Sequence, residues 1–243
     1  METTMVKPPS VSIIVPVYNE AAVIDTTISS IFEEVHILIP DAELIVVDDG
    51  SMDLTRQVLA ALVQRQPGIS VIYNAEHEGK GYALHTGAKR AAGDIICFLD
   101  CDLSIDTHYI KILVDEIKKG SDAAIASRFT KGGINHSSVT RGFVSQMFRL
   151  MRKVLIGLSP IADTQCGCKA FKREVLETTF LRTTIKGFCY DLEILYLLAR
   201  ANYKITEVPI VMQSRMIRKS KVRLFSESCK MLRDMFLIRI HHG

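Results

Sequence analysis

The sequence has no apolar run that approaches the ~20 residues needed to cross a bilayer. Its first ten residues, METTMVKPPS, contain no apolar stretch that resembles a secretory signal. Neither sign of charge is in large excess, because the net charge is +3. That value is too small to indicate a nucleic-acid partner, although local clusters of Lys and Arg can still hold phosphates. We therefore expect a protein of the cytosol that is soluble or lies on a membrane surface without spanning it.

Several common binding motifs are also missing. There is no G-x-G-x-x-G after the first expected strand, which argues against a dinucleotide-binding Rossmann domain, and no G-x-x-x-x-G-K-[ST] phosphate loop. The six cysteines stand at positions 97, 101, 166, 168, 189 and 229. Cys166 and Cys168 are too close together for the usual zinc-knuckle spacing, and no matching histidine pair follows them. We expect reduced thiols and no zinc thiolate site.

The sequence does have a high hydrophobic content and a regular alternation of elements. With 243 residues, 48% of them hydrophobic, the chain is long enough for one large α/β domain or two small ones. From residue 11 short β-like runs alternate with helical segments, a pattern typical of βαβ units and a mostly parallel sheet flanked by helices. Expected strands cover 11–18, 43–49, 69–74, 94–100 and 122–128, and expected helical segments cover 23–35, 51–68, 81–92 and 106–120. The expected helix caps are Asp53 and either Asp106 or Thr107.

Two of the expected strands end in paired acids. Asp48 and Asp49 close ELIVVDD, and Asp100 and Asp102 follow DIICFL. Ligands of open parallel sheets bind outside the carboxyl ends of the strands, so we expect the four acids along one edge. Asp100 and Asp102 can point to the same side, where two hard oxygen ligands suit Mg²⁺ or Mn²⁺ together with a substrate phosphate. The alternative is a solvated loop in which one acid caps the next helix.

Two glycine-containing turns accompany these acids. VVDDGS at 46–51 is either a simple Asp-Gly turn or a site where a carboxylate accepts hydrogen bonds from a base or ribose, with Gly50 allowing a sharp turn. EHEGKGYA at 76–83 has a single lysine, Lys80, before a helix, a place where an anion can bind. Neither turn decides the function by itself.

Taken in order, IIVPVYNE, VVDDGS, GKG, LDCDLS and SR resemble the motifs of family 2 glycosyltransferases with a GT-A fold, in which the D-x-D pair binds a metal and the diphosphate of a nucleotide-sugar. DTQCGCKAF, FCYDLEILYLLA, ITEVPI and RMIRKSK are similar to the polyprenyl-phosphate glycosyltransferases, first the dolichyl-phosphate β-glucosyltransferase branch and next the dolichyl-phosphate mannose synthases. The resemblance covers about residues 10–240. DCDLS looks closer to the mannose synthase version, so the donor stays open between UDP-glucose and GDP-mannose.

The resemblance implies roles for residues along the whole chain. It places the nucleotide-sugar against Pro16, Tyr18, Glu20, Asp48, Asp49, Lys80, Asp100, Cys101 and Asp102. It places a Mg²⁺ or Mn²⁺ ion with Asp100, Asp102 and Ser104. It places the donor and acceptor phosphates with Arg128, Arg141, Arg215 and Lys221. The residues expected to carry the reaction are Asp102, Arg128, Arg141 and Asp191.

The acceptor decides which of these residues are needed. An ionised phosphate attacks without a general base, whereas a sugar hydroxyl requires one, and two anionic reactants require cations between them. We therefore expect inverting hexose transfer to a polyprenyl phosphate, with dolichol and undecaprenol both open. Asp191 would then orient an acceptor-site Arg or Lys, or serve as an acid at a helix start. The alternatives are a family 2 transferase for a saccharide or protein hydroxyl, with Asp191 as its base, and a non-catalytic nucleotide-sugar-binding module.

The expected organisation is a disordered N-terminus at 1–9 and a single domain at 10–243. The nucleotide-sugar half covers about 10–128, and the acceptor and membrane-facing half covers about 129–243. At 141–156 an apolar helical stripe has Arg149, Arg152 and Lys153 beside it. That make-up indicates a helix at an anionic lipid surface, or alternatively a core-facing helix with a basic rim. We expect a peripheral location on the cytosolic face of a membrane.

Overall fold

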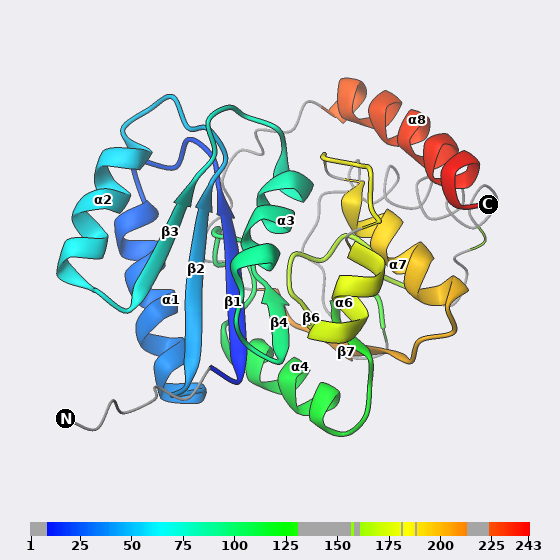
Figure 1. Ribbon diagram of the computed structural model, residues 1–243, viewed down its shortest axis with the longest axis horizontal. Coiled ribbons are helices and arrows are strands. Elements are labelled where there is room, and N and C mark those ends of the chain that lie inside the picture. The colour runs from blue at the N-terminus through cyan, green and yellow to red at the C-terminus, as the bar shows by residue number, and fades with distance from the viewer. Residues whose placement is uncertain (1–8, 131–156, 158–160, 181, 188, 213–223) are drawn as a thin grey trace, which may run out of the picture.

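The computed structural model describes residues 9–130, 157, 161–180, 182–187, 189–212 and 224–243 (Figure 1). Strands and helices alternate through the first 130 residues, as the sequence predicts. The strands are β1 (Val11–Val17), β2 (Ala42–Asp48), β3 (Ile69–Tyr73), β4 (Ile95–Phe98) and β5 (Ala123–Ser127). The helices are α1 (Ile24–Leu38), α2 (Thr55–Arg65), α3 (Lys80–Arg90) and α4 (His108–Lys118). Residues 1–8 and the helix expected at 141–156 lie outside the described residues.

The later part of the chain completes the sheet. Its described elements are β6 (Lys169–Lys172), α6 (Arg173–Phe180), α7 (Tyr190–Arg200), β7 (Ile205–Pro209) and α8 (Leu224–His242). Over the described ranges the sheet has seven strands in the order β3-β2-β1-β4-β6-β5-β7. β6 runs antiparallel to β4 and β5, and the other pairs are parallel, which confirms the predicted mostly parallel α/β sheet. No strand is expected at β6 from its sequence, because KAFK is short and has a lysine at each end.

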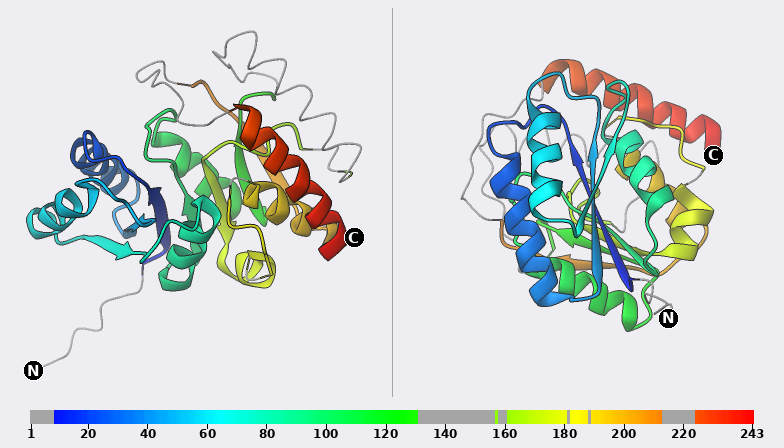
Figure 2. Two further views of the ribbon diagram at one scale, coloured as in Figure 1. Left: turned by 90° about the horizontal axis from the view of Figure 1, so that it is seen from above. Right: turned by 60° about the vertical axis from the view of Figure 1, so that its left-hand side comes forward.

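Helices cover both faces of the sheet (Figure 1 and Figure 2). One hydrophobic cluster joins α1, α2 and α4 to Ile13 and Val15 of β1. A second cluster joins α3, α6, α7 and α8 to Ile14, which points to the opposite face because strand side chains alternate. In α1 the buried side chains recur every three or four residues, which is the spacing that predicts this helix. The chain therefore forms three layers, with the sheet in the middle.

The N-cap residue of α4 is Thr107, one of the two residues predicted, whereas the N-cap residue of α2 is Leu54 and not the predicted Asp53. Asp53 stands two residues before the first residue of α2, and its Oδ1 accepts a hydrogen bond from the Thr55 N–H at 2.9 Å. Asp106 accepts in the same way from the N–H of His108, the first residue of α4, at 3.0 Å. Both acids thus satisfy the first N–H of a helix, whereas the usual cap serves the second or third helical residue.

The strand order creates a switch point at β1, which has β2 and β3 on one side and β4 on the other. Ligands of α/β sheets bind outside the carboxyl ends of the strands at such points. Val17, the last residue of β1, pairs in register with Asp48, and the Leu99 N–H donates to the Ile14 carbonyl. The acids that follow β2 and β4 therefore flank the end of β1, as the sequence predicts.

Two general features of the chain accompany this fold. Within the described ranges, no helix combines the length and the apolar character that a bilayer span requires. Among the described side chains, no disulfide joins Cys97, Cys101, Cys166, Cys168 or Cys189.

Candidate active site

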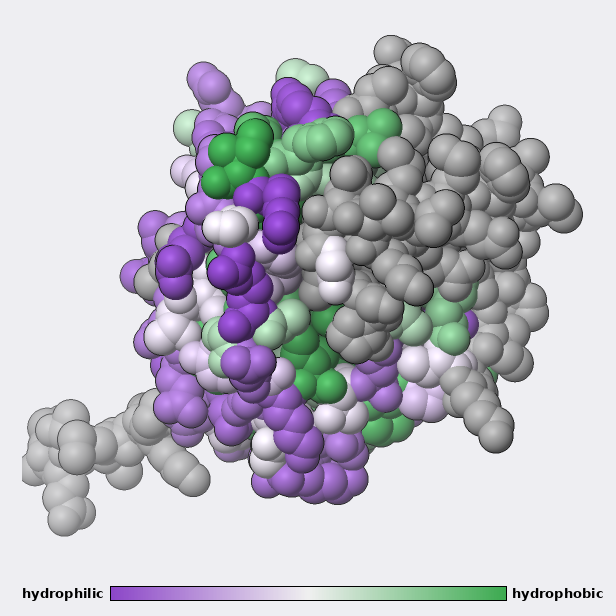
Figure 3. Space-filling view, turned by 90° about the vertical axis from the view of Figure 1, so that its right-hand side faces the viewer, coloured by the Kyte–Doolittle hydropathy of each residue, from purple (hydrophilic) through white to green (hydrophobic). Residues whose placement is uncertain are grey.

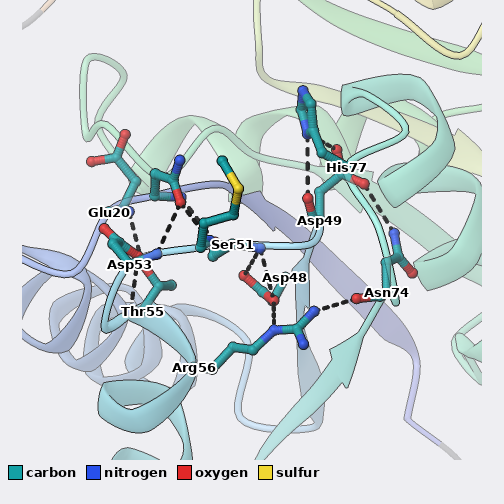
Figure 4. A network of polar contacts seen from close by, with 11 residues as sticks. Glu20, Asp48, Asp49, Ser51, Asp53, Thr55, Arg56, Asn74 and His77 are labelled. Atoms are coloured by element: carbon teal, nitrogen blue, oxygen red, sulfur yellow. Dashed lines mark hydrogen bonds and ion pairs between the residues drawn. The ribbon is translucent and has the colours of Figure 1, made fainter.

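The turn after β2 is held by a buried acid (Figure 4). Arg56 of α2 donates from Nε to Asp48 Oδ2 at 2.7 Å and also donates to the Asn74 carbonyl oxygen. The Ser51 N–H donates to both oxygens of Asp48 at 3.3 Å. Because its carboxylate is buried among these donors, Asp48 fastens the turn to α2 and to the end of β3.

Gly50 lies at the sharpest point of this turn, with φ +72°, and a Cβ there would overlap the backbone of Glu76. We expect Gly50→Ala to lower the free energy of unfolding by about 1–3 kcal/mol, because the substitution adds both left-handed strain and a backbone clash. Urea denaturation gives this value. Gly120→Ala is the matched control, since Gly120 has φ +103° but open space around it. If both variants lost the same free energy of unfolding, the clash with Glu76 would contribute nothing to the effect of Gly50→Ala.

Whereas Asp48 contacts α2, Asp49 forms hydrogen bonds with the loop before α3. Its carboxylate accepts hydrogen bonds from Asn74 Nδ2 at 3.1 Å and from the Gly79 N–H at 2.8 Å. His77 brings Nδ1 to 2.8 Å from Asp49 Oδ2. The Asp49 side chain is only 4% exposed, whereas that of His77 is 49% exposed. Asp49 therefore organises this loop, and His77 lies between its carboxylate and the solvent.

The residues that follow β1 lie beside these two acids. Tyr18 stacks on the His77 imidazole, with ring centroids 3.8 Å apart and an angle of 20° between the planes. The Glu20 N–H donates to Thr55 Oγ1 at 2.9 Å, which ties this segment to the start of α2. Pro16, half-buried, precedes the last residue of β1. The first expected nucleotide-binding residues thus lie next to the turn after β2.

Asp100, just after β4, lies between a lysine and a glycine. Lys80 in the first turn of α3 brings Nζ to 2.6 Å from Asp100 Oδ1. Burial lowers the pKa of Lys80, but the charges of Asp100 and Asp191 outweigh burial and raise the pKa above its usual range, so the lysine stays protonated. On the other side, a Cβ on Gly167 would overlap the Asp100 carboxylate. A glycine is needed there because the backbone packs directly against this carboxylate.

Asp102 lies two residues further, in a tight turn. Its Oδ1 accepts a hydrogen bond from the Ser104 N–H at 3.0 Å, and Leu103 between them has φ +50°. Asp48 and Asp100 each pair with a basic side chain, but none of the described residues forms a salt bridge with Asp102. Asp102 is therefore the acid of this edge whose charge is least compensated within the described part of the protein.

The donor set of this turn fits a hard divalent cation. Asp100 and Asp102 offer carboxylate oxygens, and Ser104 offers a hydroxyl. Burial raises the pKa of the Cys101 thiol to about 12, and the charges of Glu20, Asp100 and Asp102 add to the shift. The described residues contain no group of three or more His, Cys, Asp or Glu side chains arranged to hold a metal. An ion here would therefore complete its shell with water or substrate oxygens, as Mg²⁺ commonly does.

Arg128, just after β5, is held by a bidentate ion pair. Its Nε and Nη2 donate to the two oxygens of Asp163 at 2.7 and 2.8 Å, and its backbone N–H donates to Asp163 Oδ2 at 3.0 Å. Glu207 of β7 fixes Asp163 in turn, by accepting from the N–H groups of Ala162 and Asp163 at 2.9 and 3.1 Å. Burial lowers the pKa of Arg128, but the Asp163 carboxylate raises it by more, so Arg128 is a fixed positive charge.

Asp191, in the first turn of α7, forms an ion pair inside the protein. Lys169 of β6 brings Nζ to 2.7 Å from Asp191 Oδ1, and the exposed fractions of the two side chains are 1% and 5%. Lys169 also donates to the Cys166 carbonyl. The pair lies close to Lys80, whose pKa the charge of Asp191 helps to raise. The expected partner of Asp191 was an acceptor-site Arg or Lys, and the structure pairs it with Lys169.

The structure brings most of the expected site residues to one edge of the sheet. These residues are Pro16, Tyr18, Glu20, Asp48, Asp49, Lys80, Asp100, Cys101, Asp102 and Ser104. Arg128 comes directly after β5 and Asp191 lies in α7, and both form ion pairs. Arg141, Arg215 and Lys221 lie outside the described residues.

Sequence reasoning missed the residues that hold this set in place. Asp163, Gly167 and Lys169 stand within or beside DTQCGCKAF, and His77 stands within EHEGKGYA, so a residue-by-residue reading of the quoted motifs would have singled them out. Arg56 offers no such signal. Its contact with Asp48 depends on how α2 packs beside the end of β2, which no spacing rule gives.

The chain is similar to known glycosyltransferases over most of its length. Residues 12–180 match the family model described as Glycosyl transferase family 2. Glycosyltransferase AglD of Haloferax volcanii is 31% identical over 205 residues, which cover 82% of this chain and 32% of that protein. A dolichyl-phosphate beta-glucosyltransferase of Trichomonas vaginalis is 31% identical over 251 residues, covering 98% and 76%. A dolichol-phosphate mannosyltransferase of Pyrococcus furiosus is 32% identical over 216 residues, covering 88% and 59%. The chain thus spans about a third to three quarters of the length of these relatives.

The fold is also that of solved structures. Glucosyl-3-phosphoglycerate synthase from Mycobacterium tuberculosis, crystallised with Mn²⁺, UDP-glucose and phosphoglyceric acid, superposes with a TM-score of 0.71 at 23% identity. The superposition covers 95% of this chain and 79% of that one. This likeness confirms the fold class that the motifs predict.

Proposed function

Because this chain belongs to glycosyl transferase family 2, we propose that it transfers a hexose, glucose or mannose, from a nucleoside diphosphate sugar to a polyprenyl phosphate, with inversion at the anomeric carbon. Two of the relatives are named for dolichyl-phosphate glucosylation and dolichol-phosphate mannosylation, and the first of these aligns with 98% of this chain. Those names support the acceptor class and leave both donor sugars open.

The observation that carries the choice of a phosphate acceptor is the buried pair of Lys169 and Asp191. A transferase that uses a hydroxyl acceptor needs a base that can reach the hydroxyl proton. Asp191 was the expected candidate, but its side chain is 5% exposed and Lys169 Nζ lies 2.7 Å from its Oδ1. An ionised phosphate attacks without such a base. The pairing of Asp191 therefore favours a phosphate over a hydroxyl.

The remaining site residues suit a reaction between two anions. Asp100, Asp102 and Ser104 would hold the divalent ion, which supplies positive charge to the departing diphosphate. Lys80, held 2.6 Å from Asp100, adds a fixed cation at the same end of the sheet. Asp163 occupies two of the three guanidinium nitrogens of Arg128, and we assign the third to a substrate phosphate. In-line attack by the acceptor phosphate then gives inversion in one step.

The test is a donor and acceptor screen. UDP-glucose and GDP-mannose are each incubated with the chain, Mg²⁺ or Mn²⁺, and a short polyprenyl phosphate, and the lipid-linked sugar is detected by mass spectrometry. The matched control acceptor is the same polyprenyl alcohol without its phosphate. Transfer of sugar to the polyprenyl phosphate, with none to the polyprenyl alcohol, supports the proposal. Transfer to an alcohol or a saccharide would replace it with the hydroxyl-acceptor alternative, and donor binding without any transfer would indicate a binding module.

We also propose that the chain acts at the cytosolic face of a membrane, through the basic apolar stretch 141–156. Replacing Arg149, Arg152 and Lys153 together with Gln is expected to weaken binding to phosphatidylserine vesicles by about 100-fold, since each basic residue near an anionic surface contributes roughly 1 kcal/mol. Co-sedimentation at low and high salt measures the change, and salt alone is expected to weaken the wild type.

The control for this experiment is a second triple replacement, of Arg90, Lys118 and Lys119 with Gln. These exposed residues end α3 and α4, at the opposite edge of the sheet from the candidate site. On the described part of the surface seen in Figure 3, hydrophobic residues form a band near the top and a second group at the centre, with hydrophilic residues between them. Equal weakening by both triple replacements would place the membrane contact elsewhere.

A further inference from the structure

His77 makes two contacts at once beside the turn after β2. One face of its imidazole stacks on Tyr18 at 3.8 Å, with 20° between the ring planes. Its Nδ1 lies 2.8 Å from Asp49 Oδ2 and 3.3 Å from the Asp49 carbonyl oxygen, and Figure 4 shows the imidazole next to Asp49. A planar ring that stacks on one residue and bonds to a carboxylate through a ring nitrogen has the contacts of a bound nucleobase.

The chemistry of a nucleobase matches this position closely. Uracil and guanine are flat, carry a ring N–H that can donate to a carboxylate, and stack on aromatic side chains. Both acids of this turn are buried, but Asp48 is bonded to Arg56, whereas Asp49 already contacts the ring nitrogen of His77. His77 contacts both Tyr18 and Asp49, so a base that used the same two contacts would compete with its imidazole.

We propose that His77 occupies the nucleobase position in the ligand-free chain, and that the base of the donor binds by displacing this imidazole. The inference rests on the proposed function for the presence of a nucleotide, and adds a residue that sets the affinity for it. The His77 imidazole and the nucleobase compete for the same position, so the imidazole has to move away each time a nucleotide binds.

The surrounding backbone allows the side chain to leave without unfolding the loop. The Gly79 N–H donates to Asp49 Oδ2 at 2.8 Å, and the Glu78 N–H donates to Asp49 Oδ1 at 3.3 Å. Lys186 pairs with Glu78 at 2.7 Å from the other side. The main chain on the carboxyl side of His77 is therefore fastened, and rotation of its half-exposed side chain is enough to open the position.

The competing arrangement leaves His77 in place and stacks the base on its outer face. The two arrangements predict opposite signs for one measurement. If His77 blocks the position, the apparent dissociation constant is the intrinsic constant divided by the fraction of molecules in which the position is open. If His77 is part of the stack, its removal deletes a contact with the base.

The experiment is calorimetric titration of UDP and GDP, with Mn²⁺, into the wild-type chain and His77→Ala. We expect about tenfold tighter nucleotide binding in the variant, because no side chain has to be displaced. Inorganic pyrophosphate with Mn²⁺ is the companion probe. It lacks a base, so its affinity is expected to be the same in both proteins.

His108→Ala is the matched control. The His108 ring packs on Tyr109 at 4.0 Å, its Nδ1 lies 2.7 Å from Asp106 Oδ1, and its side chain is 49% exposed, like that of His77. We expect nucleotide affinity to be unchanged in this variant. Thermal unfolding of each variant verifies that it is folded.

Each outcome separates this inference from the proposed function. Weaker or unchanged nucleotide binding by folded His77→Ala would overturn the displacement and leave the nucleotide site standing. Tighter binding of pyrophosphate together with UDP would also overturn it, because the effect would then concern the phosphates. A wild-type chain that binds neither UDP nor GDP would instead overturn the proposed function.

Discussion

Asp102→Asn is expected to lower kcat by about 100- to 1,000-fold, the range found when a preorganised charge contact to the transition state is removed. Asp102 is the acid of the site that forms no salt bridge with the described residues, so its charge is available to a divalent ion. The variant keeps an oxygen that can accept the Ser104 N–H, now 3.0 Å from Oδ1. The turn should therefore persist while the charge is lost. Initial rates at saturating donor, acceptor and Mn²⁺ measure the effect.

Asp106→Asn is the control for this substitution. Asp106 lies on the same loop and accepts a hydrogen bond from the His108 N–H, which an amide oxygen can also accept. We expect its kcat to stay within about twofold of the wild type, as for surface substitutions that keep their contacts. Circular dichroism of both variants reports the fold. Near-normal turnover by Asp102→Asn would show that this carboxylate holds no ion.

The largest expected loss of stability follows from Asp191→Asn. The substitution leaves the Lys169 charge buried without its carboxylate, and breaking a buried ion pair in this way costs about 3–5 kcal/mol in free energy of unfolding. The double variant Lys169→Met with Asp191→Leu removes both charges, and it should be clearly more stable than Asp191→Asn. Urea denaturation compares the two. Equal stability of the wild type and Asp191→Asn would contradict the buried pair.

This loss of stability changes how activity assays of Asp191→Asn are interpreted. Reduced total activity would follow from unfolding alone, so kcat has to be expressed per folded molecule at a temperature well below the transition. With a phosphate acceptor, the folded variant should retain substantial turnover, because no base is removed. The motif resemblance assigns Arg141 and Lys221 to the substrate phosphates, so under the proposed function Arg141→Ala and Lys221→Ala are expected to lower kcat more than Asp191→Asn does.

The sequence was informative wherever the physical signal is local. Buried strands such as β1 and β2 are apolar runs, and α1 has a helical apolar spacing, so their order and the parallel sheet follow directly. The position of Asp48 and Asp100 at one edge then follows from the geometry of parallel strands. The same reasoning gives the D-x-D turn as the candidate metal site.

Contacts between distant segments could not be predicted in this way. β6 could not be predicted because a lysine such as Lys169 is normally exposed. Here Lys169 is buried through its ion pair with Asp191 of α7, a contact between segments far apart in the sequence. For the same reason, the sequence does not distinguish the roles of Asp48 and Asp49 in nucleotide binding. Only the packing of Arg56 against Asp48, and of His77 against Asp49, distinguishes the two acids.

The position of β6 has a consequence for how the chain is made. β4 pairs with β1 on one side, but its other neighbour comes about 70 residues later, at Lys169–Lys172. At roughly 10 residues per second on the ribosome, the outer side of β4 stays unpaired for several seconds. An open edge of buried residues such as Ile96 and Phe98 is a template for aggregation. A chain cut after residue 128 would keep that edge permanently, so the amino-terminal half needs the later half to stay in solution.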